Sequence, residues 1–147
     1  MFTLEEQKII DQALEITESK RLDKFVNTTV LAKIEATLHL STQQREIFTV
    51  FFLNSQYQLI AREDLFKGTI NAAQVYIREI AIAALKHNST AIIIAHNHPS
   101  GCLVPSDADR RMTDKIVQVL RPLDIQVLDH LLVAKGDCMS FAESGFI

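Results

Sequence analysis

Two histidines, a serine and an aspartate follow one another closely in the second half of the chain, as His96, His98, Ser106 and Asp109. Imidazole nitrogens and carboxylate oxygens are ligands that zinc takes in proteins. Three protein ligands with a fourth position left for water characterise catalytic zinc sites, whereas structural sites are closed by four protein ligands. We therefore predict that His96, His98 and Asp109 bind a divalent cation, Zn²⁺, which activates water for hydrolysis.

A hydrolase of this kind also needs a carboxylate outside the metal's own ligands, which takes a proton from the attacking water and passes it to the leaving group. Glu46 is the best candidate, because it opens an apolar segment that can form a strand beside the one ending at His96. The competing interpretation of Glu46 is a solvated charge at a strand entry. Glu63 and Glu79 are alternatives, for which we expect a strand-end charge and a place on a solvated helix face.

Ser106 and Asp109 also form a helix N-terminal capping signal, in which the serine oxygen accepts a backbone N–H and the acid is favoured by the helix dipole. Capping and chemistry can coexist at these two residues. Asp129 and His130 lie in a buried-looking segment, where we expect structural hydrogen bonds around the site rather than metal ligation. Cys102 is expected to be a small loop thiol.

The elements that position these residues follow from the spacing of the apolar side chains. Residues 90–95 form a short β-branched run typical of a strand buried on both faces, so the histidines stand where a core strand ends. Ser106 precedes an amphipathic helix over residues 107–120. The other predicted elements are helices over residues 4–18, 28–38 and 72–86, strands over 46–53, 57–61 and 125–133, and a compact C-terminal finish.

The order of these elements predicts an α/β fold, in which a mixed sheet is packed between helices. Residues 43–147 are expected to form one domain that carries the metal site. Residues 1–42 are expected to form a helical N-terminal extension, and no proline or glycine separates the extension from the domain. We therefore expect it to dock on the domain rather than to swing freely.

Composition limits the classes of function. The 147 residues are 48% hydrophobic, which is enough for one core. The net charge of −3 does not favour charge-driven binding of nucleic acid, although a local basic patch could still exist on such a chain. Two cysteines without paired spacing fit a reducing compartment. The acidic N-terminus lacks the features of a secretory signal, and no apolar run approaches the ~20 residues needed to cross a bilayer. We expect a cytoplasmic protein with no membrane partner.

The spacing His96-x-His98, seven residues, Ser106, two residues, Asp109 resembles the JAMM motif of MPN-type metalloproteases. More narrowly, residues 96–109 resemble the bacterial RadC family, and the resemblance extends over about residues 14–147. It implies a cytidine-deaminase-like architecture and a zinc-dependent hydrolase, with His96, His98 and Asp109 matching the zinc ligands. It further implies that Glu46 matches the glutamate that acts as general base, and that Ser106 matches the hydroxyl that stabilises the tetrahedral intermediate.

The leading hypothesis is a JAMM-type zinc metalloprotease that cleaves an amide or isopeptide bond in a protein or peptide substrate. One alternative is a metal-dependent nuclease or DNA-repair-associated protein, which the acidic net charge disfavours. Another is a non-catalytic MPN-type interaction scaffold. A zinc deaminase is disfavoured, because that chemistry uses a Cys-x-x-Cys pair that this sequence lacks. The substrate and the oligomeric state stay open.

Overall fold

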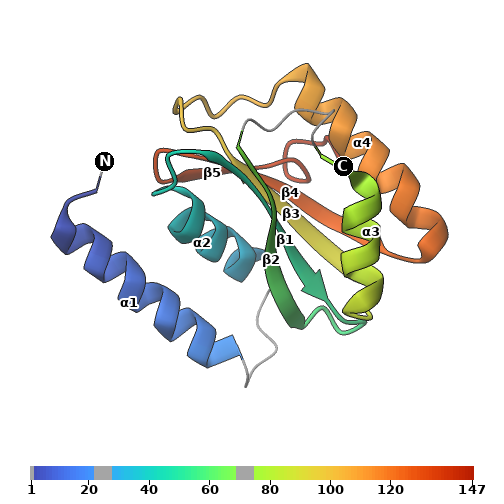
Figure 1. The fold of residues 1–147 in the computed structure, drawn as a ribbon, viewed down its shortest axis with the longest axis horizontal. Helices are drawn as coiled ribbons and strands as arrows, with labels where there is room; N and C mark the ends of the chain where they lie inside the picture. Colours follow the sequence, from blue (N-terminus) through green and yellow to red (C-terminus); the bar gives the residue numbers. More distant parts are fainter. Residues whose placement is uncertain (1, 22–27, 69–74) are drawn as a thin grey trace.

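The structure is a computed structural model, and it describes residues 2–21, 28–68 and 75–147. Its helices and strands follow one another along the chain as shown in Figure 1. In order they are α1 (Leu4–Arg21), α2 (Thr28–Leu40), β1 (Glu46–Leu53), β2 (Leu59–Gly68), α3 (Ile77–Lys86), β3 (Ala91–Asn97), α4 (Asp107–Leu120), a short 3-10 turn (Arg121–Leu123), β4 (Gln126–Ala134) and β5 (Asp137–Ser140).

The strands form a mixed five-stranded sheet in the order β2-β1-β3-β4-β5. β3 and β4 run parallel, and the connection between them passes through α4, whereas the other neighbouring pairs are antiparallel. Helices α3 and α4 cover one face of the sheet, and α2 lies on the other (Figure 1). The α/β fold with a mixed sheet between helices, predicted from the sequence, is confirmed.

Both faces of the central strands are buried, and the alternation of side chains along each strand divides the core into two halves. The half beneath α3 and α4 takes these residues from β1 and β3: Phe48, Val50, Phe52, Ile92 and Ile94. The half beneath α2 takes Ile47, Phe51, Leu53, Ile93 and Ala95 from the same strands. Because His96 continues the series of residues 92 and 94, its side chain leaves the sheet on the α4 side.

The largest departures from the predicted elements are at three places, while other ends, such as those of α1 and β3, shift by two or three residues. Strand β2 begins at Leu59 and extends to Gly68, beyond the predicted 57–61, because a partly exposed edge strand tolerates the polar residues of its second half. Helix α3 begins at Ile77; the first part of the predicted helix, residues 72–74, lies outside the described residues, and residues 75 and 76 are not helical. Strand β5 was predicted only as part of a compact finish, because four residues are too few to show an alternating pattern.

The two helices of the predicted N-terminal extension differ in how much of their apolar surface is buried. Helix α2 buries Ala32, Ala36 and Leu40 in the core beneath the sheet. Helix α1 contacts α2 but leaves Leu4 and Ile9 largely exposed. The division of the chain between residues 42 and 43 stays a prediction.

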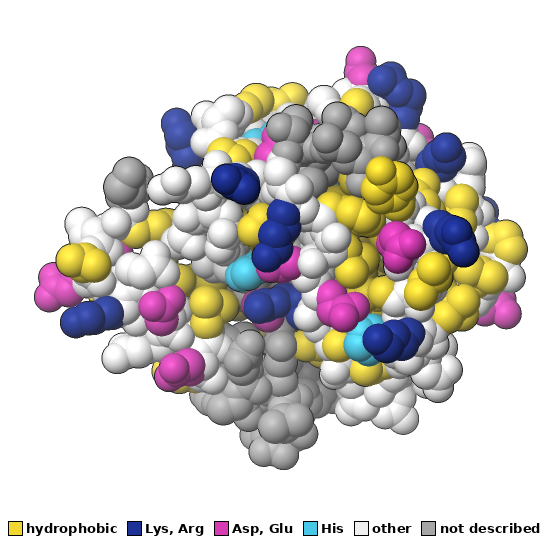
Figure 2. All heavy atoms as spheres, viewed as in Figure 1, with side chains coloured by type: hydrophobic (Ala, Val, Ile, Leu, Met, Phe, Trp, Pro, Cys, Tyr) yellow, Lys and Arg dark blue, Asp and Glu magenta, His cyan; other side chains and the backbone are white. Residues whose placement is uncertain are grey.

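The surface mixes charges of both signs. On the face shown in Figure 2, Lys and Arg side chains are interspersed with Asp and Glu. A field built from such a mixture is weak at a distance, because opposite charges within a Debye length of about 8–10 Å cancel. Among the described helices, none is both long and apolar enough to span a bilayer.

Candidate metal centre

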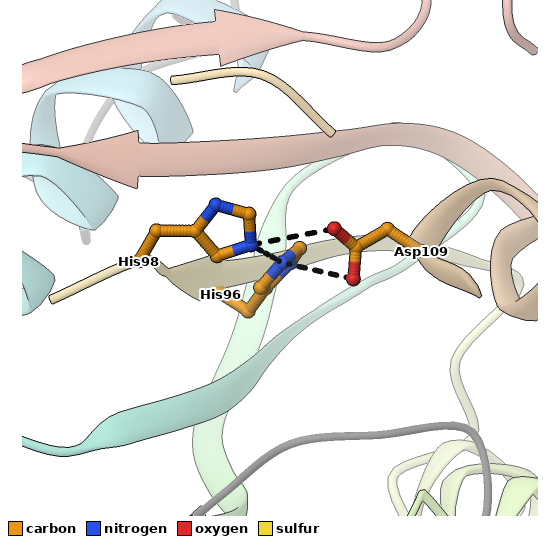
Figure 3. A group of neighbouring side chains, drawn as sticks. All are labelled: His96, His98 and Asp109. Atoms are coloured by element: carbon orange, nitrogen blue, oxygen red, sulfur yellow. Dashed lines mark hydrogen bonds and ion pairs between the residues drawn. The ribbon is translucent and has the colours of Figure 1, made fainter. Parts of the chain in front are cut away.

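The predicted ligands come together where the end of β3 meets the start of α4 (Figure 3). His96 is the next-to-last residue of β3, and His98 follows the strand directly. The backbone N–H of His98 donates to the carbonyl of Val133 at 2.9 Å, so β4 continues to hold the chain beyond the end of β3. Asp109 lies in the first turn of α4, and its side chain points back toward both imidazoles.

The three side chains approach one another at distances that suit one small cation. His96 Nε2 and His98 Nε2 are 3.2 Å apart, while Asp109 lies 3.5 Å from His96 Nε2 through Oδ1 and 3.3 Å from His98 Nε2 through Oδ2. Two ligands held about 2.05 Å from a zinc ion at the tetrahedral angle lie about 3.3 Å apart. The described residues thus contain a His-His-Asp candidate metal site, with one ligand atom from each residue within 4.8 Å of the others.

The loop after β3 fixes which nitrogen of His98 faces the site. Its Nδ1 lies 2.9 Å from the carbonyl oxygen of Cys102. Since a carbonyl only accepts, Nδ1 carries the proton and Nε2 presents a lone pair to the site. The loop returns because Gly101, at φ +85°, closes a turn through its N–H to the carbonyl of His98. The Cys102 thiol is free and exposed, as expected of a loop thiol, but its carbonyl has a positioning role that the side-chain type could not reveal.

Asp109 serves the helix and the site together. Ser106 Oγ accepts the Asp109 N–H at 3.0 Å, and Asp109 Oδ2 accepts the Ser106 N–H at 2.9 Å, so the predicted capping signal is confirmed as a complete capping box. Burial alone raises the pKa of Asp109, but hydrogen bonding and charge attraction from His96, with the hydrogen bonds from Ser106, outweigh it and hold that pKa well below its ordinary value. The carboxylate therefore stays ionised, as a metal ligand must be.

Glu46 opens β1, as predicted. In the register of β1 and β3, Phe48 stands opposite His96, and Glu46 lies two residues nearer the end of β1 that adjoins His98. Residues opposite each other and two apart share a face of the sheet, so Glu46 lies on the α4 side together with His96. Its role as a general base stays a prediction, as does a catalytic role for Ser106.

The two rival glutamates lie elsewhere. Glu63 is inside β2 rather than at a strand end, because β2 is longer than predicted, and its carboxylate pairs with His87 at 3.1 Å. Glu79 lies on the exposed face of α3, as expected. Neither residue belongs to the group of side chains that could hold a metal.

Asn97 is a residue that the sequence analysis missed. It lies between the two histidines of the candidate site, and its side chain leaves the sheet on the opposite face, where it is buried. Its Oδ1 accepts the N–H of Ile47 at 2.7 Å, and its Nδ2 donates to the carbonyl of Arg45 at 2.9 Å. Asn97 therefore ties the backbone on both sides of Glu46 to the strand that carries the histidines. No local pattern in the sequence points to this role, because both bonded partners lie about fifty positions away in the chain.

The expectation that Asp129 and His130 make structural hydrogen bonds is confirmed. Asp129 accepts from the N–H of His130 at 2.7 Å and of Ala142 at 3.0 Å, which ties β4 to the C-terminal segment. His130 is fully buried, and its Nε2 lies 2.7 Å from Nδ1 of His96. Burial, followed by the proximity of His96, lowers the pKa of His130 well below its ordinary value, so the ring is neutral.

Comparisons with known proteins agree with the site. The family model described as a RadC-like JAB domain matches residues 11–146. A UPF0758 protein of Pseudoalteromonas translucida (strain TAC 125) is 53% identical over 111 residues, which are 76% of this chain and 50% of that protein. UPF0758 proteins of Histophilus somni strains 2336 and 129Pt are 53% identical over 108 residues, or 74% of this chain and 49% of theirs. The chain spans about half the length of these curated relatives, and it belongs to the family of proteins with a RadC-like JAB domain.

Proposed function

We propose that this chain is a zinc-dependent hydrolase of the metallopeptidase class, which cleaves an amide or isopeptide bond in a protein or peptide. The observation that carries the proposal is the convergence of two imidazole nitrogens and an ionised carboxylate at the separations expected of a tetrahedral zinc site. The His98 side chain remains 17% exposed. Three protein ligands that reach the surface on one side leave room for water and substrate, as catalytic zinc sites do.

A zinc ion bound by His96, His98 and Asp109 would lower the pKa of a coordinated water toward ~7 and polarise a substrate carbonyl. Glu46 then acts as the general base and delivers the proton to the leaving nitrogen. The shared sheet face of Glu46 and His96 supports this assignment. Glu46 is therefore the first residue to test.

Ser106 suits the stabilisation of a developing oxyanion. In the capping box its Oγ accepts a hydrogen bond from the Asp109 N–H. A serine hydroxyl has one donor and two acceptor sites, so accepting in the cap does not consume its proton. The same residue can thus start α4 and donate to a negatively charged oxygen beside the metal.

The test compares Glu46→Gln with Glu63→Gln, which is the same substitution on the neighbouring strand β2, outside the candidate metal site. Metal content is measured by elemental mass spectrometry, and turnover is measured on peptide and isopeptide substrate libraries. We expect both variants to bind zinc one to one, and only Glu46→Gln to lose turnover, by about 10²–10⁴-fold as general bases contribute.

Three outcomes would contradict the proposal in different ways. Full activity of Glu46→Gln would remove Glu46 from the mechanism. A zinc-loaded parent that cleaves nucleic acid and no amide bond would replace the substrate class. A parent that binds zinc and hydrolyses nothing would favour the scaffold alternative.

A further inference from the structure

A chain of short hydrogen-bonding contacts leads from His96 away from the candidate metal site and into the core. His96 Nδ1 lies 2.7 Å from His130 Nε2, and His130 Nδ1 lies 2.6 Å from Thr113 Oγ1. Thr113 Oγ1 lies 2.8 Å from the backbone carbonyl oxygen of Asp109. His96, His130 and Thr113 are each at most 1% exposed, so bulk water does not compete for these contacts.

The direction of the chain follows from the protons available. A hydroxyl has one proton, and a carbonyl oxygen can only accept, so the contact with the Asp109 carbonyl is favourable only if Thr113 donates to it. Thr113 must then accept from His130, which places the His130 proton on Nδ1. In the opposite direction, two oxygen lone pairs would face each other at 2.8 Å, in a buried place where such a contact is costly.

The His130 proton in turn decides the state of His96. A neutral imidazole with its proton on Nδ1 has a lone pair on Nε2, and that lone pair faces His96. His96 therefore donates from Nδ1. When His96 is neutral, as a metal ligand must be, Nδ1 carries its only proton, and Nε2 presents a lone pair at the point where it meets His98 and Asp109. A proton on His96 Nε2 would occupy the direction that a metal needs.

We infer that Thr113 and His130 are positioning residues for the metal, which hold His96 in the tautomer that can bind through Nε2. This inference rests on the proposed metal site but not on hydrolysis. Thr113 is one helical turn beyond Asp109 on α4, and His130 is on β4, so the ligand from the sheet and the ligand from the helix are set by one network.

The test compares Thr113→Val, which keeps the shape of the side chain but removes the hydroxyl, with Thr113→Ser, which keeps the hydroxyl. Zinc dissociation constants are measured by competition with a chelator of known affinity, and circular dichroism checks the fold. Loss of a group behind a metal-ligating histidine costs about 10- to 100-fold in affinity, which we expect for the valine variant, whereas the serine variant should stay within about threefold of the parent. Equal affinity of Thr113→Val and the parent would overturn the inference.

A second measurement needs no variant. In the zinc-loaded parent labelled with ¹⁵N-histidine, long-range proton–nitrogen correlation spectra report which ring nitrogen carries the proton. We expect the proton on Nδ1 of both His96 and His130, and a proton on Nε2 of His130 would overturn the inference. A parent that shows these tautomers but cleaves nothing would refute the proposed hydrolysis alone, and a parent that binds no zinc would refute the metal site and the inference together.

Discussion

Replacing Asn97 with alanine is expected to destabilise the protein through β1, although Asn97 is not one of the candidate metal ligands. The substitution removes the hydrogen bonds to the N–H of Ile47 and to the carbonyl of Arg45, together with a longer and weaker one, at 3.5 Å, to the carbonyl of Gln43. Ile47 is buried, so its N–H is left without a partner, which costs about 1–3 kcal/mol. Arg45 is exposed and its carbonyl can bind water instead, so the second loss is nearer the ~1 kcal/mol net worth of an ordinary hydrogen bond.

The two terms together give a loss of about 2–4 kcal/mol in the free energy of unfolding, or roughly a 30- to 900-fold change in the folding equilibrium. Urea unfolding of the metal-free protein, followed by circular dichroism, measures this loss without a contribution from zinc. Gln56→Ala removes an amide side chain from an exposed turn and serves as the matched control, with an expected change within about 0.5 kcal/mol. If Asn97→Ala unfolds at the urea concentration of the parent, Asn97 does not hold the start of β1.

Two further perturbations test the loop and the edge of the sheet. Gly101→Ala should lower the free energy of unfolding by about 1–2 kcal/mol, because φ is +85° there and a Cβ would lie 2.1 Å from Lys135 Cε. Thermal unfolding measures this loss, and an unchanged midpoint would mean that the turn relaxes freely. Burial alone raises the pKa of Asp64, but hydrogen bonds from His39 and Thr49 outweigh it and lower that pKa, so its stabilising contribution is present above about pH 4, the unfolded pKa, and is lost as the pH falls below that value. Urea midpoints from pH 3 to 7 should therefore fall less steeply with acid in Asp64→Asn than in the parent, and parallel curves would contradict the assignment.

The sequence predicts most of the fold because the buried strands and helices have strong apolar patterns. Strand β3 is a continuous run of buried residues, and α4 shows a helical apolar stripe, so both were located correctly. Strand β5 could not be located, since four residues of mixed polarity gain their structure only by pairing with β4. The far end of β2 is stabilised in the same way, by its partner β1.

The candidate ligands could be predicted because their chemistry depends on residue type and on near neighbours in the chain. Ser106 and Asp109, which form the capping signal, are three positions apart in the sequence, and the two histidines are two positions apart. The residues that position the site could not be found in this way. Asn97 bonds to Ile47, fifty positions away, and Thr113 meets His130 across the helix–sheet interface, so neither has a local pattern to reveal it.

The double use of the Asp109 carboxylate affects how relatives of this protein should be compared. The helix cap depends on that carboxylate whether or not a metal is bound, so selection for a stable α4 would preserve Asp109 even in a relative that binds no metal. His98 is different, because it lies beyond the strand, is partly exposed, and bonds through its ring to the loop carbonyl of Cys102 rather than to a helix. The loss of His98, rather than the retention of Asp109, is therefore the change by which a metal-free branch of the family would be recognised.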